Sequence, residues 1–202
     1  MSDADAAIGV LGSAFNPPHL GHLALAQEAF WQLGLDEVVL VPTGEAPHKE
    51  IADDPGREAR MEMTRLAASG DERFSVSALE VDRDGPSYAY ETLEALAEER
   101  ADRKLVFVMG ADAAVGLGAW RELERVVALA SLAVARRDGV SEEEVAAVTR
   151  EFGCEERMTM LDMPRLGVSS SAVRERARKG RPLRYLVPTP VAEYIEEGGI
   201  YR

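Results

Sequence analysis

The chain has 202 residues, of which 46% are hydrophobic and 29% are charged, and its formal net charge at pH 7 is −13. This composition is typical of a soluble globular protein that is large enough for one full hydrophobic core. The acidic charge argues against general nucleic-acid binding, which depends on a basic surface. We therefore expect one domain over residues 1–202, in which any site for a polyanion has to gather its few cations locally.

The sequence predicts neither a membrane protein nor a secreted one. No apolar stretch is long enough to span a bilayer, and residues 1–7 lack the basic region and apolar core of a signal peptide. Cys154 is the only cysteine, which rules out an internal disulfide and fits a reducing compartment. We expect a cytoplasmic protein in which Cys154 is a half-buried structural thiol.

Strand-like and helical runs alternate along the chain. Short apolar runs predict strands, and apolar residues three or four positions apart predict helices. This alternation indicates βαβ units and therefore an α/β fold, a single doubly wound, Rossmann-like domain with a mostly parallel sheet and helices on both faces. In chain order we expect a strand at 8–11, a helix from 19 onward, a strand at 37–41, a helix at 57–68, an extended segment at 74–81, a helix at 88–100, strands at 104–109 and 132–135, a helix at 141–152, a strand at 158–161 and two C-terminal helices.

Two helices carry clear signals at their ends. Ser141 and Glu144 have the spacing of a capping box. Thr189 can cap the last helix with Pro190 at its first position, and Gly198 lies just past its end. In doubly wound sheets, ligands bind beyond the carboxyl ends of the strands, so the loops after the predicted strands are the candidate site.

Residues 12–22 read Gly-Ser-Ala-Phe-Asn-Pro-Pro-His-Leu-Gly-His and follow the first predicted strand. Gly12 and Ser13 would let the chain leave the strand tightly, and the two prolines would keep a helix from starting before His19. His19 and His22 then share one side of a helix N-terminus, where free N–H groups and the helix dipole attract anions. A solvated strand-to-helix turn is the alternative, but two histidines in HxGH favour a phosphate site.

The loop after the second predicted strand brings in the third histidine. His48 and Lys49 could decorate an exposed loop, as a lone lysine usually does. Together they place a histidine and a cation at a strand end where a phosphate would bind, so we favour a functional role.

The loop after the strand at 104–109 holds an acidic and an aromatic candidate. Asp112 could cap a helix or accept hydrogen bonds from a ribose, and the sequence does not decide between the two. Trp120 follows Gly116 and Gly118, which indicate an exposed, mobile loop. A tryptophan is more often a core residue, but in such a loop it could stack on a flat ring.

Residues 168–174 read Val-Ser-Ser-Ser-Ala-Val-Arg and form the second strong signal. Ser170 or Ser171 can cap a helix that runs to Lys179 and ends at Gly180. Arg174 would then lie in the first turn, where the helix dipole disfavours a cation unless a bound anion is also present. The alternative is an arginine that simply turns toward solvent.

These two segments resemble the two signatures of the nucleotidylyltransferase superfamily. The first resembles [GS]-x-[ST]-F-[DN]-P-x-H-x-G-H, with Asn16 as one of the residues the superfamily uses at that position. Ala14 departs from the usual Thr or Ser, so one hydroxyl contact to phosphate is missing. The second resembles [IV]-S-S-[ST]-x-[IV]-R, and both occur in the order the superfamily has them.

The rest of the chain resembles one branch, the bacterial nicotinate-nucleotide adenylyltransferases, over nearly its whole length. The matching segments are 42–49 (PxxxPPHK), 85–93 (GPSYTxxTL), 110–120 (GxDxxxxxxxW), Arg136-Arg137 (RRPG, with Asp138 in place of the proline) and 185–202 (YLVPxxVxxYIxxxxLYR). The C-terminal helical part, about 168–202, carries the second ATP-binding signature.

The resemblance implies adenylyl transfer from ATP to nicotinate mononucleotide, giving nicotinate adenine dinucleotide and pyrophosphate in NAD biosynthesis. Mg²⁺ would be carried mainly by the ATP phosphates, with no dedicated protein site. The implied catalytic residues are His19, His22 and Arg174; further ATP contacts come from Gly12, Ser13, Ala14, Phe15, Gly110, Asp112, Ser170 and Ser171, and mononucleotide contacts from Asn16, Thr43, His48, Lys49, Ser87, Tyr88, Ala89, Trp120 and Arg136. The resemblance implies that Arg136 would hold the mononucleotide phosphate together with His48 and Lys49, and that Ser170 and Ser171 would lie on the adenine side.

The implied partners are the two small substrates, with neither nucleic acid nor a membrane, and a homo-oligomer stays open. Two alternatives also stay open. One is a related enzyme that prefers nicotinamide mononucleotide, because one or two donors at the ring decide between acid and amide. The other is a non-catalytic nucleotide sensor, for which the departures at Ala14 and Asp138 are the only support.

Overall fold

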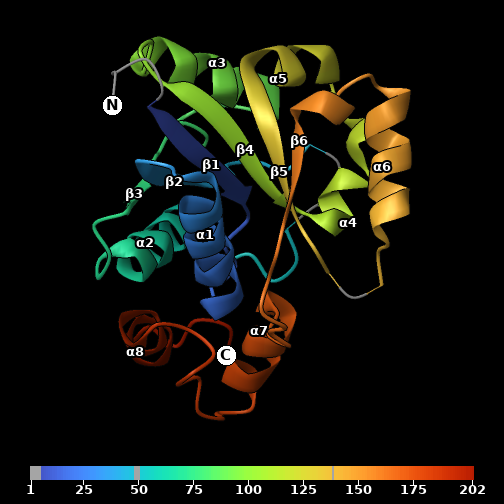
Figure 1. The fold of residues 1–202 in the computed structure, drawn as a ribbon. Coiled ribbons are helices and arrows are strands. Elements are labelled where there is room, and N and C mark those ends of the chain that lie inside the picture. Colours follow the sequence, from blue (N-terminus) through green and yellow to red (C-terminus); the bar gives the residue numbers. More distant parts are fainter. Residues whose placement is uncertain (1–5, 48–50, 138) are drawn as a thin grey trace. The chain divides into compact units, whose positions relative to one another are not determined.

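The computed structural model describes residues 6–47, 51–137 and 139–202 (Figure 1). Within these residues the strands form one sheet with the order β3-β2-β1-β4-β5-β6. The pairings β1–β4, β4–β5 and β5–β6 are parallel. The predicted Rossmann-like α/β fold is therefore confirmed. The strands are β1 (Ala7–Ser13), β2 (Glu37–Pro42), β3 (Phe74–Val76), β4 (Lys104–Gly110), β5 (Ala130–Ala135) and β6 (Met158–Leu161).

Most helices lie within one or two residues of their predicted bounds. The exceptions are α4 and α5, which the sequence did not predict, because segments of four and seven residues are too short to show a helical period. The helices are α1 (Leu20–Leu33), α2 (Arg57–Ala68), α3 (Ala89–Glu99), α4 (Ala111–Ala114), α5 (Leu123–Leu129), α6 (Glu142–Glu151), α7 (Ser170–Arg178) and α8 (Thr189–Glu197), with 3₁₀ turns at Leu117–Ala119 and Glu155–Arg157.

The extended segment predicted at 74–81 is shorter than expected. Strand β3 ends at Val76, and the chain then turns. The Ser77 hydroxyl accepts a hydrogen bond from the Leu79 N–H at 3.3 Å, and the Asp82 N–H donates to the Ala78 carbonyl at 2.8 Å. These local bonds compete with the ladder of the sheet and end the strand.

The helix caps are partly as predicted. The Ser141–Glu144 capping box is present at α6. Helix α7 is capped by Ser169, whose hydroxyl accepts from the Ala172 N–H at 3.3 Å, so the predicted caps Ser170 and Ser171 were wrong. Helix α8 begins at Thr189, one residue earlier than predicted, and Gly198 ends it.

The described residues divide into two compact units, each assembled from separate chain segments. Unit 1 is formed by the described residues of Met1–Gly12, Leu25–Val39 and Tyr88–Arg165, and unit 2 by those of Ser13–Ala24, Leu40–Ser87 and Leu166–Arg202. The expectation of a single domain stays a prediction. Each predicted site residue is therefore described within its own unit.

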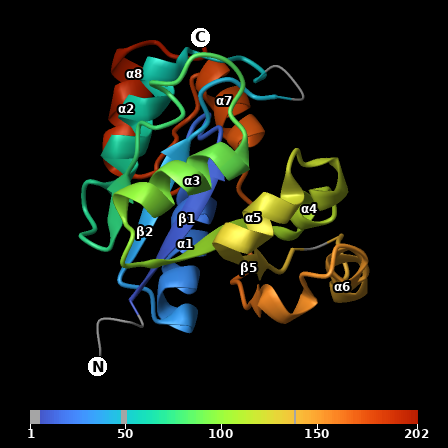
Figure 2. The same ribbon diagram turned by 90° about the horizontal axis from the view of Figure 1, so that it is seen from above.

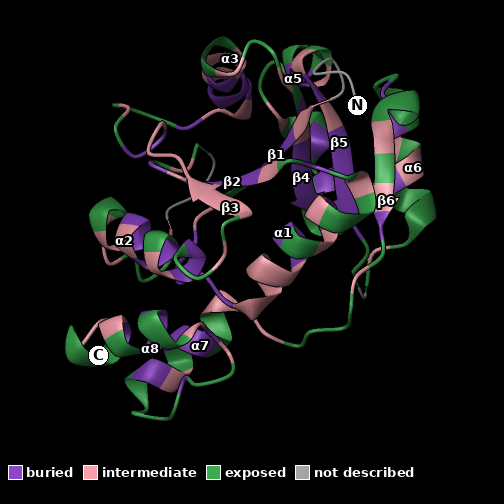
Figure 3. Ribbon diagram, turned by 60° about the vertical axis from the view of Figure 1, so that its left-hand side comes forward, coloured by how far each residue is buried: buried purple, intermediate pink, exposed green. Residues whose placement is uncertain are grey.

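Unit 1 contains the parallel core of the sheet. Helices α3 and α5 lie side by side against β4 and β5 on one face, and the part of α1 from Leu25 onward covers the other face (Figures 1 and 2). The strands β4 and β5 are mostly buried (Figure 3). The order of the strands reverses between β1 and β4, so the loops that follow these strands are where a doubly wound sheet binds its ligand.

Unit 2 has a separate hydrophobic core between α2, α7 and α8. Helices α2 and α8 lie against one another (Figure 2). This core packs α2, α7 and α8 together. Its buried members are Met63, Ala67, Val173, Ala177, Leu183, Val187, Val191, Ala192 and Ile195.

The lengths of the helices and the burial of Cys154 bear on the expected compartment. Among the described residues, every helix is too short or too polar to cross a bilayer. Cys154 is fully buried, not half-buried, and its Sγ–H donates to the Thr149 carbonyl at 3.5 Å. Burial raises the pKa of the Cys154 thiol, which makes it an inert structural group.

Candidate phosphate-binding site

The turn after β1 is made by a phenylalanine instead of the expected glycine. Phe15 has a φ of 46°, in the left-handed region, and its side chain is fully buried. Gly12 still belongs to β1, and a Cβ placed there would meet only the Phe107 ring at 3.8 Å, an ordinary contact. The prediction that Gly12 provides the tight exit from the strand was therefore wrong. Phe15 also contacts His22 edge-on, with ring centroids 4.9 Å apart.

The two histidines of HxGH lie on the same side of the N-terminus of α1, as predicted. Their rings are stacked, with centroids 3.8 Å apart and an interplanar angle of 26°. The His19 N–H donates to His22 Nδ1 at 3.2 Å, and the Gly21 N–H donates to His19 Nδ1 at 3.1 Å. This reciprocal arrangement has the form of a capping box built from imidazoles.

These bonds determine which ring nitrogen carries the proton. A neutral imidazole has one acceptor and one donor nitrogen, and in both rings Nδ1 is the acceptor. For neutral rings, this assigns the protons to the two Nε2 atoms. His22 Nε2 is 3.3 Å from the Ser13 hydroxyl oxygen, to which it can donate. The pair presents two N–H donors that suit phosphate oxygens.

The backbone N–H groups of α1 do not provide the anion site that the sequence predicted. The Leu20 N–H donates to the Leu186 carbonyl at 2.9 Å, Gly21 to His19 Nδ1, and the next N–H to the His19 carbonyl at 2.9 Å. The donors at this helix end are thus used within the protein. The imidazole Nε2–H groups take their place, and the helix dipole still favours negative charge there.

Arg174 lies close to the HxGH loop although 152 residues separate it from His22 in the sequence (174 − 22). The side chain is buried, and Nη1 donates to the Asn16 carbonyl at 2.8 Å. Nη2 donates to the Ser171 hydroxyl at 3.3 Å and Nε to Asp53 Oδ2 at 3.1 Å. Because α7 is capped by Ser169, Arg174 is its fifth residue and lies past the predicted first turn.

A second bond joins the two signatures. The Ser170 hydroxyl donates to the Pro17 carbonyl at 2.9 Å. Ser170 and Ser171 are therefore used to hold the loop and the arginine together. Their predicted contacts with the adenine side stay predictions.

Asn16 has a structural position that the sequence did not indicate. It is buried, its Oδ1 accepts from the Tyr201 hydroxyl at 2.6 Å, and its Nδ2 donates to the Ala52 carbonyl at 2.8 Å. Burial raises the pKa of Tyr201, so the phenol stays protonated and keeps donating. This geometry does not favour direct contact between the Asn16 amide and a substrate.

Arg60 is the functional residue that sequence reasoning missed. It is fully buried on α2, and its guanidinium donates to the carbonyls of Ala14 at 3.1 Å and Gly44 at 2.9 Å, and to that of Thr43. Nε donates to Asp54 at 2.8 Å. One guanidinium thus joins the turn after β1 to the loop after β2. The available signal was an arginine on the apolar face of an amphipathic helix.

The loop after β2 depends on a close approach of two backbones. A Cβ at Gly44 would lie 2.0 Å from the Glu80 carbonyl oxygen, so only glycine fits there. The Gly44 N–H donates to the buried Ser87 hydroxyl at 3.1 Å, which gives Ser87 a structural role. The predicted phosphate ligands His48 and Lys49, and also Asp138, lie outside the described residues.

In unit 1, Asp112 is not a helix cap. Gly110 caps α4, and Asp112 is the second residue of that helix. Its carboxylate forms an ion pair with Arg137 at 2.5 Å, with more than half of each side chain exposed. Of the two roles open for Asp112, capping is excluded, and ribose binding stays a prediction.

Trp120 and Tyr88 are both packed against neighbours in unit 1. Trp120 is half-buried and contacts Phe107 edge-on, with ring centroids 5.5 Å apart. Gly116 and Gly118 are exposed, as predicted, but Leu117 between them is buried in a 3₁₀ turn. The Arg121 guanidinium lies 4.9 Å from the Tyr88 ring centroid, and Ala89 begins α3.

Arg136 is paired with two carboxylates. Nε donates to Glu142 at 2.7 Å, and Nη1 donates to Asp162. The bond to Glu142 raises the pKa of Arg136 and lowers that of Glu142. A substrate phosphate would have to displace both carboxylates, so this geometry does not favour the predicted phosphate role.

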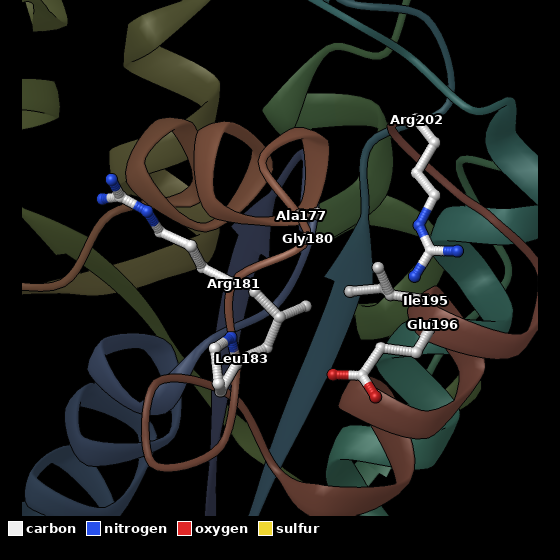
Figure 4. Close-up of a pocket in the computed structure, with 8 residues that line it drawn as sticks. Ala177, Gly180, Arg181, Leu183, Ile195, Glu196 and Arg202 are labelled. Atoms are coloured by element: carbon white, nitrogen blue, oxygen red, sulfur yellow. The ribbon is translucent and has the colours of Figure 1, made fainter.

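Figure 4 shows a pocket in unit 2. It has a volume of about 290 Å³ and none of the residues predicted from the sequence lines it. Within the described part of the chain, no three His, Cys, Asp or Glu side chains are grouped so as to hold a metal ion. The pocket lining is Ala177, Gly180, Arg181, Pro182, Leu183, Ile195, Glu196 and Arg202.

Comparison with known proteins shows the family of the chain. The cytidylyltransferase-like family model matches residues 10–176. A probable nicotinate-nucleotide adenylyltransferase from Roseiflexus sp. (strain RS-1) is 40% identical over 199 residues, covering 98% of this chain and 100% of that protein. One from Synechococcus sp. (strain JA-3-3Ab) is 39% identical over 196 residues, covering 96% and 94%.

Among solved structures, the Plasmodium falciparum nicotinic acid mononucleotide adenylyltransferase complexed with NaAD matches with a TM-score of 0.78 over 97% of each chain. Its sequence is 17% identical, so this likeness shows the fold alone. The family model and the curated relatives carry the assignment further. This chain belongs to the cytidylyltransferase-like family, in its nicotinate-nucleotide adenylyltransferase branch.

Proposed function

We propose that the protein transfers the adenylyl group of ATP to nicotinate mononucleotide, giving nicotinate adenine dinucleotide and pyrophosphate in NAD biosynthesis. The observation that carries the proposal is the stacked pair His19–His22, whose two Nε2–H groups are donors because the backbone occupies both Nδ1 atoms. Two fixed donors beside a buried arginine suit a polyphosphate.

The reaction needs no protein nucleophile. A phosphate oxygen of the mononucleotide attacks the α-phosphorus of ATP in line, a new P–O bond forms, and the bond to the β-phosphate oxygen breaks, releasing pyrophosphate. Catalysis then rests on positioning and on stabilising the charge of the phosphoryl oxygens. The His19 and His22 Nε2–H groups and the Arg174 guanidinium are the donors we assign to this task.

Arg174 has donors left for such a ligand. Each terminal nitrogen of the guanidinium carries two hydrogens, and one on each is used by Asn16 and Ser171. Within the described residues, the second hydrogen on each nitrogen has no protein acceptor. These two N–H groups can therefore donate to phosphate oxygens.

We propose that Mg²⁺ is held mainly by the ATP phosphates. The side chains described at the phosphate site are mostly donors, and its carboxylate Asp53 is paired with two arginines. Such a set suits a metal that arrives with its own phosphate ligands. Its chemistry would be to neutralise charge on the β- and γ-phosphates.

The mononucleotide side of the proposal rests on the family pattern. His48 and Lys49 are assigned to the mononucleotide phosphate. Gly110 and Asp112 are assigned to the adenosine ribose, and Trp120 with the backbone near Ala89 to the pyridine ring and its carboxylate. We place the reaction in the cytoplasm, which suits a chain whose single cysteine is a buried thiol.

One assay tests the proposal. Purified protein is mixed with ATP, Mg²⁺ and nicotinate mononucleotide, and pyrophosphate release is followed. Tight ATP binding without turnover would point to the nucleotide sensor instead. Comparing kcat/KM for the nicotinate and nicotinamide mononucleotides then decides the substrate, and a preference for the amide would overturn the specificity proposed here.

A further inference from the structure

A three-residue segment of unit 2, Ala52–Asp54, is bonded at every residue to a side chain from elsewhere in that unit. The Ala52 carbonyl accepts from Asn16 Nδ2 at 2.8 Å. Asp53 accepts from Arg174 Nε at 3.1 Å, and Asp54 accepts from Arg60 Nε at 2.8 Å. We call this segment the strap.

The strap connects the parts of the phosphate site to one another. Asn16 belongs to the HxGH loop, and Arg174 belongs to α7. Arg60, on α2, also donates to Ala14 in the turn after β1. The position of the strap is therefore determined by the same side chains that shape the site.

Asp53 is the residue of the strap that acts on a phosphate-binding group. Its Oδ2 accepts from both Arg174 and Arg178, one turn apart on α7. The bond from Arg174, together with that from Arg178, holds the pKa of the Asp53 carboxyl below its usual range, so it is charged at neutral pH. One carboxylate against two guanidiniums leaves a net positive charge for an incoming anion.

Asp53 and two other acceptors bond to different nitrogens of the Arg174 guanidinium. Asp53 takes the Nε side, while the Asn16 carbonyl and the Ser171 hydroxyl take one hydrogen each on the terminal nitrogens. The plane of the guanidinium is thus fixed from three directions. A second hydrogen remains on each of Nη1 and Nη2, and a guanidinium held in one plane is the kind of fixed donor that preorganised charge stabilisation requires.

The backbone of Asp53 supports a specific role. Its φ is 52°, in the left-handed region that Asp and Asn tolerate better than other side chains. An asparagine there keeps the backbone preference and the shape but removes the charge. The Asp53→Asn variant therefore isolates the contribution of the carboxylate.

We propose that Asp53 is a positioning residue for ATP binding, which orients the Arg174 guanidinium toward the polyphosphate from within the strap. This inference rests on the proposed function, because it takes ATP as the ligand. It assigns Asp53 no contact with the substrate. Its effect is expected on ATP and not on the mononucleotide.

The test compares Asp53→Asn with Asp71→Asn. Asp71 also accepts from an arginine, Arg73, in the turn between α2 and β3, so its variant removes a similar ion pair from the same unit. For Asp53→Asn we expect the Kd and KM for ATP to rise about tenfold, because the variant loses one charge-assisted hydrogen bond to Arg174. The KM for nicotinate mononucleotide should change less than about twofold. Asp71→Asn should leave the Kd and both KM values at wild-type levels.

The affinity of Asp53→Asn for ATP can contradict the proposal. If Asp53→Asn binds ATP as well as or better than the wild type, the carboxylate competes with the phosphates and the proposal is wrong. A second comparison uses the Arg174→Ala background, where adding Asp53→Asn should raise the Kd for ATP no further. A further tenfold rise there would show that Asp53 acts on something other than Arg174.

Failure of the proposed function can be told apart from failure of this inference. The Kd for ATP is measured by calorimetry without the mononucleotide, so it does not depend on turnover. A wild-type protein that binds ATP but releases no pyrophosphate refutes the proposed reaction only. The change in Kd on Asp53→Asn still decides the role of the strap.

Discussion

Arg174 and Arg136 were both predicted to bind phosphate, and the structure surrounds them differently. The Arg174 side chain is 9% exposed and is held by a backbone carbonyl, a hydroxyl and one shared carboxylate. The Arg136 side chain is 41% exposed and is paired with two carboxylates of its own. The positive charge of an arginine that is held largely by neutral acceptors remains available to an anionic ligand. The charge of an arginine between two carboxylates is already balanced by them.

The net charge of the chain, −13, makes ion pairing of its arginines common. Most of its arginines have acidic neighbours available, so pairing is the default. Arg174 differs, because it is buried beside a backbone carbonyl and a hydroxyl and shares its one carboxylate with Arg178. The following substitutions test this contrast.

The largest effect is expected from the pair Arg174→Ala and Arg136→Ala. Arg174→Ala should lower kcat/KM for adenylyl transfer by about 10³-fold, because it removes a donor that stabilises phosphoryl charge. Arg136→Ala should change kcat/KM by less than about twofold. Steady-state kinetics with both substrates varied checks both. A tenfold rise in the KM for the mononucleotide on Arg136→Ala would break the contrast.

The next effect concerns the imidazole donors. His22→Ala should lower kcat by about 10²-fold while circular dichroism and thermal unfolding show an intact fold. His22→Gln should retain more activity than His22→Ala, because the glutamine amide nitrogen can reach the position of Nε2 and donate. An effect on KM alone, with kcat unchanged, would mean that His22 only binds.

A smaller effect, on stability, is expected at Arg60. Arg60→Met leaves the carbonyls of Ala14, Thr43 and Gly44 without their donor, so the free energy of unfolding should fall by about 3 kcal/mol. Urea denaturation measures it. Arg57→Met, on the exposed side of the same helix, is the matched control and should leave the midpoint nearly unchanged. Equal midpoints for the two variants would contradict the bridging role of Arg60.

The smallest effect is expected at Ala14, which stands where the family usually has a hydroxyl. Ala14→Thr should leave kcat/KM equal to that of the wild type or somewhat higher. The Ala14 carbonyl, not its side chain, is what Arg60 holds, so the substitution keeps that bond. A marked loss of activity in the same kinetic assay would show that the turn after β1 does not tolerate the family's hydroxyl.

Much of the fold could be predicted because local patterns decide it. The continuous apolar run at 104–109 predicts a buried parallel strand from its own residues, and the capping box at Ser141 needs only four consecutive residues. Helices α4 and α5 and the early end of β3 could not be predicted, since short segments show no period and turn hydrogen bonds compete with strand pairing.

Of the geometry at the candidate site, the sequence predicted only what depends on local spacing. The histidine pair followed from helical spacing. The cap of α7 is local, but three consecutive serines left open which of them would be the cap. The bond from the Leu20 N–H to the Leu186 carbonyl and the pairing of Arg136 with Asp162 depend on partners distant in the sequence. Arg60 was missed for the same reason, because the three carbonyls it binds come from two separate loops.

The sequence by itself determined the superfamily and the positions of most strands and helices along the chain. It also placed His19 and His22 on one side of a helix. All of these depend on motifs and patterns whose residues lie close together in the chain. The tertiary structure decided which of the cations are paired with carboxylates. It brought Asn16, Asp53 and Arg174 together from three segments and paired Arg136 with acids. An arginine's availability for phosphate depends on which acceptors surround it, and only the folded chain brings those acceptors into place.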